Sequence, residues 1–206
     1  MRESVFLVDD DADVRDAVRF LLATEGLHVQ AFSSPAEILE FITPEHGGCL
    51  LLDVRLPEMN GLELQEALRH RGIQLPIVFI SGHGDIPMAV RAINAGALDF
   101  VEKPFNDDLL LEKVNNALEI SRTNREHEGS RRDIEDRVAS LTPREREVME
   151  GILQGKLNKV IAYDLGVSVR TVEVHRAHVL EKLAARNTSD MVRLVLSTES
   201  YRNWLL

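Results

Sequence analysis

Three things are scarce in this sequence: cysteine, long apolar runs and positive charge. The one cysteine, Cys49, lies within an apolar run, so we expect a buried thiol, and a single thiol excludes an internal disulfide. No run of about eighteen apolar residues is present, so no transmembrane helix is expected. The first residues, MRESVFLVDDD, lack the apolar region and cleavage site of a signal peptide. These absences predict a cytoplasmic protein that does not enter a membrane.

The scarcity of positive charge is uneven along the chain. The 206 residues include 24 basic and 34 acidic side chains, for a net charge of −10. Residues 1–120 hold 9 of the basic and 21 of the acidic ones, net −12, which leaves 15 and 13, net +2, for residues 121–206. The acidic half is therefore unsuited to nucleic acid by itself, and +2 is a weak electrostatic signal. DNA binding must be argued from sequence pattern.

Short apolar runs alternate with helical patterns in the first half. Val14, Val18 and Leu22, for example, are spaced to share one face of a helix after the first run. Apolar strands alternating with amphipathic helices indicate a parallel sheet covered on both faces. We predict an α/β, doubly wound domain of five parallel strands and five helices that ends near Glu119. The expected strands are Val5–Val8, Val29–Phe32, Cys49–Leu52, Ile77–Ile80 and Leu98–Val101.

The strand pattern stops in the second half. Residues 120–140 carry five basic and five acidic side chains and few apolar ones, which predicts a solvated helical linker interrupted near Gly129. A frayed extension of the preceding helix remains an alternative. Thr142, Pro143 and Glu145 then form a helix start with a capping box, and everything beyond reads as helix. The expected domains are 1–120, a linker at 121–137, and an all-α four-helix domain at 138–206.

Carboxylates follow two of the expected strands. Asp9 and Asp10 come directly after the first strand and Asp53 after the third. Ligands of open parallel sheets bind at the carboxyl ends of strands, so these groups should meet at one edge. Without compensation they would repel one another and raise each other's pKa. Mg²⁺ resolves this conflict, because it prefers one or two carboxylates together with water and phosphate oxygens.

The fourth and fifth strands lead to Ser81 and to Lys103, which stands before Pro104. A hydroxyl and an ammonium group are suited to bind the oxygens of an incoming phosphoryl group. One carboxylate would then be the nucleophile and two would hold Mg²⁺. Taken singly, each of these residues is more often part of a solvated loop or a helix cap. The hypothesis of phosphoryl chemistry rests on their conjunction at four strand ends.

The stretches VDDD, LLLDVRLPEMNG, FISGHGD and FVEKPF resemble the receiver domain of two-component response regulators, and the likeness covers residues 3–120. The resemblance implies that Asp53 accepts phosphate from a sensor histidine kinase. It implies that Asp10 and Asp53 ligate Mg²⁺ directly, with Asp9 nearby and the Arg55 backbone carbonyl also bound. By the same resemblance, Ser81 and Lys103 contact the phosphoryl group, Lys103–Pro104 is a cis peptide, and Phe100 is the aromatic switch. From the pattern alone Phe100 is a core residue.

A rival class, the phosphatases with an Asp-x-Asp motif, uses its second carboxylate as a general acid. Position 55 here is an arginine, so that acid is missing. We therefore expect a phosphoprotein that holds a signal, not an enzyme.

Residues 158–183 have the pattern of a helix-turn-helix, with Gly166 in the turn. On a helical wheel Val172, Val179 and Leu183 share a core stripe, whereas Val174 and Ala177 face outward. Small apolar side chains there suit the floor of a major groove and a thymine methyl group. Arg170, near the helix start, could contact guanine or a phosphate. An ordinary surface helix and a protein-interaction module remain alternatives.

Residues 138–200 resemble the LuxR-type DNA-binding domain of the NarL/FixJ family, and TVEVHRA and GHGDIPMAV are most similar to the FixJ branch. The resemblance implies groove contacts by Glu173, Val174 and Ala177. Many relatives have lysine where this chain has Glu173, and an acid there repels phosphate but accepts from a cytosine amino group. The residues implied to serve phosphates or packing are Asn158, Lys159, Arg170, Thr171, His175, Arg176, His178 and Lys182. His175 lies toward the core side of the wheel.

These features together predict a phosphorylation-activated transcription regulator that binds double-stranded promoter DNA as a homodimer, with RNA polymerase as a further partner. Phosphate on Asp53 should draw in Ser81 and Lys103 and repack Phe100. The Ile86–Val101 surface would then form the dimer, as in the FixJ group. The main alternative is a DNA-binding protein that does not depend on phosphorylation and whose receiver only dimerises.

Overall fold

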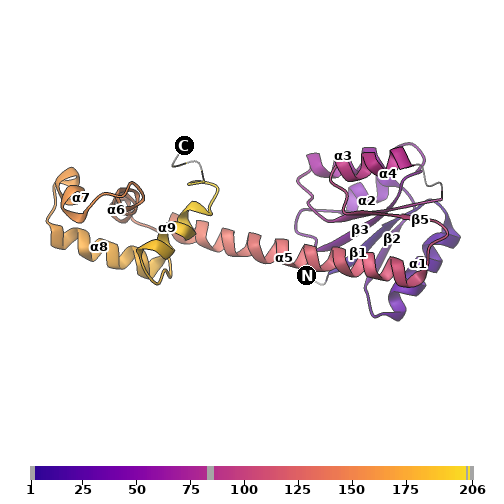
Figure 1. Ribbon diagram of the computed structural model, residues 1–206, viewed down its shortest axis with the longest axis horizontal. Coiled ribbons are helices and arrows are strands. Elements are labelled where there is room, and N and C mark those ends of the chain that lie inside the picture. Colours follow the sequence, from indigo (N-terminus) through magenta and orange to yellow (C-terminus); the bar gives the residue numbers. More distant parts are fainter. Residues whose placement is uncertain (1–2, 83–85, 203, 205–206) are drawn as a thin grey trace. The chain divides into compact units, whose positions relative to one another are not determined.

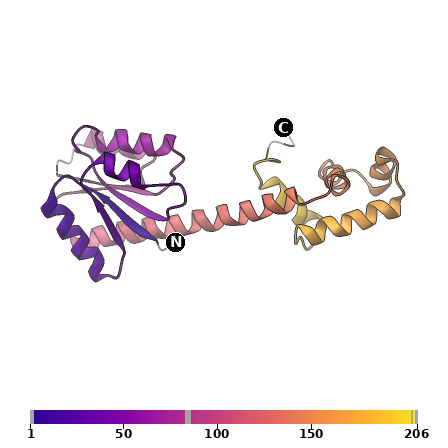
Figure 2. The same cartoon turned by 180° about the vertical axis from the view of Figure 1, so that it is seen from behind.

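The computed structural model describes residues 3–82, 86–202 and 204, and the chain divides into two compact units, residues 1–125 and 126–206. Figures 1 and 2 show the two units from opposite sides.

The first unit contains a five-stranded parallel sheet in the order β2-β1-β3-β4-β5. This order places β1 and β3 side by side at the point where the chain changes direction across the sheet, which is where ligands of such folds bind. All five predicted strands are present, with bounds that differ from the predicted ones by at most one residue. They are β1 (Ser4–Val8), β2 (Val29–Phe32), β3 (Gly48–Asp53), β4 (Ile77–Ser81) and β5 (Asp99–Glu102).

Helices cover both faces of the sheet, as the apolar strands require. Along β1, Phe6 and Val8 pack into one core with α2, α3 and α4, whereas Val5 and Leu7 pack into another with α1 and α5. Figure 1 shows the two groups of helices on opposite sides of the strands. The bounds are α1 (Ala12–Thr24), α2 (Pro35–Phe41), α3 (Gly61–His70), α4 (Ile86–Asn94) and α5 (Asp107–Ala139).

The predicted interruption near Gly129 is wrong, because α5 is one helix from Asp107 to Ala139. A glycine inside a helix costs about 1 kcal/mol relative to alanine, which is too little to break a helix by itself. The surrounding arginines and glutamates are good helix formers, and Asp133 pairs with Arg137 one turn later at 2.8 Å. The helix is also anchored beyond the polar stretch, where Val138 is buried in the core of the second unit.

The second unit consists of helices joined by turns, with no strand among its described residues. The capping box at Thr142 and Glu145 is confirmed, as is the cap at Ser168, and Gly166 ends α7 with a left-handed φ of 66°. Val172, Val179 and Leu183 are at most 1% exposed, so the core stripe of the wheel is correct. The helices after α5 are α6 (Pro143–Leu153), α7 (Asn158–Leu165), α8 (Val169–Lys182) and α9 (Thr188–Leu196).

Candidate functional site

The three predicted acids meet at the carboxyl edge of the sheet. Val8 of β1 pairs in register with Leu52 of β3, so the residues that follow lie next to each other. One carboxylate oxygen from each of Asp9, Asp10 and Asp53 lies within 4.8 Å of the other two. Asp9 and Asp53 are buried and Asp10 is exposed. Three carboxylate oxygens therefore lie close enough together to bind one cation, and one of them, from Asp10, is exposed to water.

Lys103 reaches the same point from the end of β5. Its Nζ lies 2.6 Å from Asp9 Oδ2 and 2.7 Å from Asp53 Oδ2. The Lys103–Pro104 peptide is cis, as the family resemblance implies. The Lys103 backbone N–H donates to the Ser81 carbonyl at 2.7 Å, and Ser81 itself is buried at the end of β4. The four strand ends thus bring together the carboxylates, the ammonium group and the serine that the sequence singled out.

The protonation of this cluster follows from burial and pairing. Burial raises the pKa of the Asp9 carboxyl, although the bonds from Lys103 and from the Asp11 backbone N–H act to lower it. Burial alone would lower the pKa of Lys103, but its hydrogen bonds to Asp53 and Asp9 together raise it. The ammonium form of Lys103 is therefore strongly favoured, and it offsets part of the repulsion among the acids.

Backbone groups hold the two buried acids in place. Asp53 Oδ1 accepts from the Arg55 backbone N–H at 2.9 Å, and Asp9 Oδ1 accepts from the Asp11 N–H at 2.9 Å. Gly61, at the start of α3, lies so close that a Cβ there would stand 2.4 Å from the Asp53 carbonyl oxygen. A larger residue at this position would displace the end of β3.

The residues present fit a magnesium ion. Mg²⁺ takes oxygen ligands and keeps several waters, and it is usually bound by one or two carboxylates. Asp10 is the acid best placed to bind an ion that keeps its waters. Its carboxylate has no hydrogen bond or ion pair among the described residues, and it remains exposed. The role expected for the Arg55 carbonyl stays a prediction.

Phe100 lies on β5 beside Phe79 of β4 and packs, partly buried, against the core under α2, α3 and α4. This position agrees with the core assignment made from the pattern, and the switch role stays a prediction.

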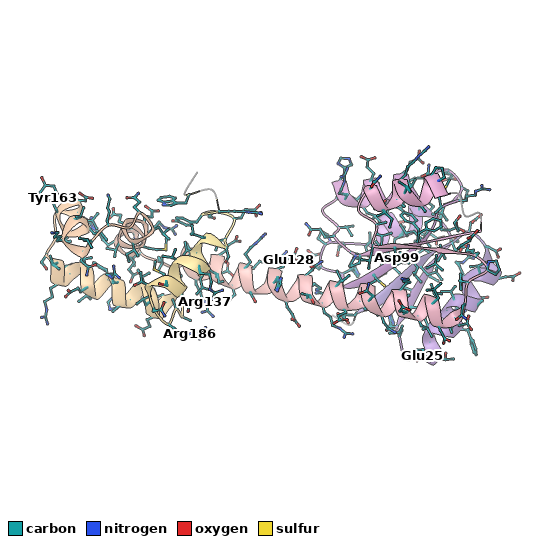
Figure 3. The ribbon with its side chains drawn as sticks, in the orientation of Figure 1. Glu25, Asp99, Glu128, Arg137, Tyr163 and Arg186 are labelled. Carbon is teal, nitrogen blue, oxygen red and sulfur yellow. The ribbon has the colours of Figure 1, made fainter. Side chains whose placement is uncertain are left out.

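The predicted dimer surface, Ile86–Val101, carries exposed apolar side chains: Val90 and Ile93 of α4 are 52% and 45% exposed. Asp99, labelled in Figure 3, bonds to Lys113 of α5 at 3.0 Å. Residues 83–85 of the GHGDIPMAV stretch lie outside the described residues.

In the second unit, Val174 and Ala177 are exposed on α8, as the helical wheel predicts. Lys159, Arg170 and Glu173 are exposed as well, and none of the three has a hydrogen bond or ion pair within the described part of the chain. The outer surface of α8 and the start of α7 therefore carry charged and small apolar side chains that are available to a ligand.

Other candidates for DNA contact are bonded within the unit. Arg176 donates to Asn158 Oδ1 at 3.0 Å and to Thr188 Oγ1 at 2.9 Å, which ties α8 to α7 and α9. Lys182 donates to Glu145 Oε2 at 2.7 Å.

Three further candidates lie close to these contacts. His178 Nδ1 stands 3.7 Å from Glu145 Oε1, and the Thr171 hydroxyl bonds to Ser168. His175 is half-buried, with its Nδ1 unpartnered among the described residues.

Two residues that bear on the sites were not singled out from the sequence. Arg15 of α1 donates to the Asp9 carbonyl at 2.6 Å. Glu145, noted only as a cap, also holds Lys182. No local sequence signal marks either contact, because each joins groups that only the tertiary fold brings together.

A doubly wound sheet with three acids and a lysine at its carboxyl edge, followed in the chain by a helix-turn-helix unit, defines a response regulator that binds DNA. Comparison with known families agrees. Residues 5–115 match the response regulator receiver domain, and residues 139–195 match the bacterial regulatory proteins of the luxR family. The chain belongs to the NarL/FixJ family of response regulators.

Relatives resemble the chain over nearly its whole length. It is 43% identical over 192 residues to the transcriptional regulatory protein FixJ of Azorhizobium caulinodans, covering 93% of this chain and 91% of the relative. It is 43% identical over 190 residues to the response regulator protein TmoT of Ectopseudomonas mendocina, covering 92% and 86%. The solved structure of the response regulator StyR matches with a TM-score of 0.84 and 42% identity, covering 95% of this chain and 98% of that one.

The function of the family follows for the chain. It is a two-component transcription regulator, controlled by phosphorylation of its receiver and acting through a LuxR-type DNA-binding domain. A kinase and DNA are thus its partners. Among the residues that the structure describes, no helix is both long and apolar enough to span a membrane.

Proposed function

We propose that Asp53 is the phosphoryl acceptor. One Asp53 carboxylate oxygen attacks the phosphorus of a phosphohistidine on the sensor kinase. The new O–P bond makes an acyl phosphate, while the N–P bond breaks and the leaving imidazole nitrogen takes up a proton. The observation that carries this proposal is the convergence of Asp53 with two further acids and Lys103 at one point. A carboxylate placed among these groups is a nucleophile with charge compensation at hand.

The neighbouring residues divide the remaining work. Asp10 and Asp53 would hold Mg²⁺, with Asp9 and the Arg55 carbonyl beside it. The ion would neutralise the charge that accumulates on the phosphoryl oxygens. The Lys103 ammonium group and the Ser81 hydroxyl would bind those oxygens once the phosphoryl group is in place. Arg55 stands where phosphatases with an Asp-x-Asp motif place their acid, so the acyl phosphate should persist as a signal.

The proposed response is a shift between two populated states. Phosphate on Asp53 draws Ser81 and Lys103 toward it, Phe100 repacks, and the Ile86–Val101 surface changes. Val90 and Ile93 give this surface its exposed apolar side chains, which a second copy would cover. We propose that phosphorylation favours a homodimer there.

In the DNA-binding domain we propose groove contacts by Glu173, Val174 and Ala177 and phosphate contacts by Lys159 and Arg170. All five are exposed, and the three charged ones are unpaired within the described chain. A dimer would match a two-fold operator and double the phosphate contacts of one weakly basic unit. RNA polymerase is the further partner that we propose at the promoter. The domain division 1–120, 121–137 and 138–206 belongs to the same proposal.

The test is the solution mass of the chain with Mg²⁺, with and without beryllofluoride, which stands in for the phosphoryl group on Asp53. Wild type should shift from monomer to dimer on addition of beryllofluoride. Asp53→Asn should not shift, because it lacks the carboxylate. A dimer of both proteins under all conditions would instead support a receiver that only dimerises. An unchanged monomer would refute phosphate-driven dimerisation and leave release of the DNA-binding domain as the mechanism.

A further inference from the structure

Asp9 and Asp10, two of the three acids at the proposed metal site, lie between β1 and α1, but no side-chain contact among the described residues holds the Asp10 carboxylate in place. Its carboxylate has no hydrogen bond or ion pair within the part of the chain that the structure describes. Its direction is therefore set by the backbone on either side. On the C-terminal side, the Asp11 side chain caps α1 by accepting from the backbone N–H of Asp13 and Val14. On the N-terminal side, the orientation of the Asp10 side chain depends on the peptide that joins Asp9 to Asp10.

Arg15 fixes that peptide. Its Nη1 donates to the Asp9 carbonyl oxygen at 2.6 Å, so the guanidinium group is bonded to the peptide plane from which Asp10 projects. The same contact joins α1, which carries Arg15, to the backbone that follows β1.

We propose that Arg15 is a positioning residue for the metal site: it locks the Asp9–Asp10 peptide so that the Asp10 carboxylate faces the ion. The inference rests on the proposed function, since it takes Asp10 as a metal ligand. A positioning role and a purely electrostatic effect of Arg15 predict opposite changes in Mg²⁺ affinity when the arginine is removed. A fixed cation beside a magnesium site repels the ion, so removing it should tighten Mg²⁺ binding if charge alone matters. Removing a group that orients a ligand should weaken binding instead.

The experiment titrates Mg²⁺ alone into the full chain by isothermal calorimetry, at a temperature at which circular dichroism shows each variant folded. Arg15→Gln, which removes the charge and cannot span the same distance, should bind Mg²⁺ about tenfold more weakly than wild type. Arg15→Lys keeps the charge and an ammonium group that can donate, but it loses the planar guanidinium fork. Its Mg²⁺ affinity should therefore fall between those of wild type and Arg15→Gln.

Arg19→Gln is the matched control. Arg19 lies one turn further along α1 and, among the residues that the structure describes, pairs only with Asp16, at 2.9 Å. This variant therefore loses the same charge without affecting the contact with the Asp9 carbonyl. Its Mg²⁺ affinity should equal that of wild type or slightly exceed it. An affinity of Arg15→Gln equal to or above that of wild type would overturn the positioning role. Failure of wild type itself to bind Mg²⁺, or binding that Asp10→Asn leaves unchanged, would instead overturn the proposed metal site.

Discussion

Two arginines on α8 differ in what their guanidinium groups contact. Arg176 bonds to Asn158 and Thr188 inside the unit, whereas Arg170 is exposed and unpaired among the described residues. Arg176→Ala should therefore lower the free energy of unfolding of the second unit by about 1–3 kcal/mol, because two partners lose their donor. Arg170→Ala should change it by less than about 0.5 kcal/mol. Urea unfolding followed by the fluorescence of Trp204, the single tryptophan, measures this unit.

For DNA binding we expect the opposite order: Arg170→Ala should have the larger effect and Arg176→Ala the smaller one. Arg170→Ala should weaken binding at every salt concentration and reduce the slope of log K against log salt by about one, the signature of one lost phosphate contact. Arg176→Ala, measured where it is folded, should keep the wild-type slope. A reduced slope for Arg176→Ala with unchanged stability would show that its internal bonds open on DNA.

The residues of the acidic site could be predicted because each stands at a strand end, and strand ends of a parallel sheet converge. The positions of Asp9, Asp53 and Lys103 at strand ends were enough to predict that their side chains lie close together. Arg15 could not be predicted, because its contact is with a backbone carbonyl, which leaves no mark on the sequence. Its position on a half-exposed helix face also reads as an ordinary solvated arginine.

At the scale of elements, Glu145 joins the start of α6 to the end of α8. Lys182 donates to its carboxylate, and so does the Thr142 backbone N–H, and these bonds lower the pKa of Glu145 from 4.5 to about 2. The folded state thus binds this proton more weakly than the unfolded state. The stabilisation is complete above the unfolded pKa near 4.5 and is lost as the pH falls from there toward 2.

The measurement is the urea unfolding of the second unit, by Trp204 fluorescence, from pH 7 to pH 3 in wild type and Glu145→Gln. The difference in unfolding free energy between the two proteins isolates this carboxylate from all others. It should shrink by about 1–2 kcal/mol over that range. A difference that stays constant with pH would mean that the Lys182 contact contributes nothing as an ion pair.

The elements themselves were predictable where apolar periodicity decided them. All five strands and the caps at Thr142 and Ser168 follow from local pattern. The continuity of α5 did not, because around Gly129 the sequence has no apolar face and one poor helix former. The helix continues there because residues further along it, such as Val138, are buried in a core. A local sequence pattern does not contain such tertiary contacts.

At the scale of the whole molecule, charge sets how the regulator meets DNA. The net charge of −10 divides into −12 for residues 1–120 and +2 for the rest, so one copy has a small electrostatic attraction for a duplex and carries an acidic domain that opposes it. Two copies on a two-fold site would double the contacts with phosphate, while specificity would stay with the proposed groove-facing side chains. We therefore expect the proposed dimerisation to be the step that changes the affinity for DNA most.

The slope of log K against log salt measures this directly, because each neutralised phosphate releases counterions. With Mg²⁺ and beryllofluoride, the wild-type protein should bind its operator with about twice the slope of the untreated protein. Asp53→Asn should keep the lower slope in both conditions. If beryllofluoride raises affinity at an unchanged slope, the number of phosphate contacts is the same in both states. The receiver would then act by uncovering one DNA-binding domain, not by pairing two.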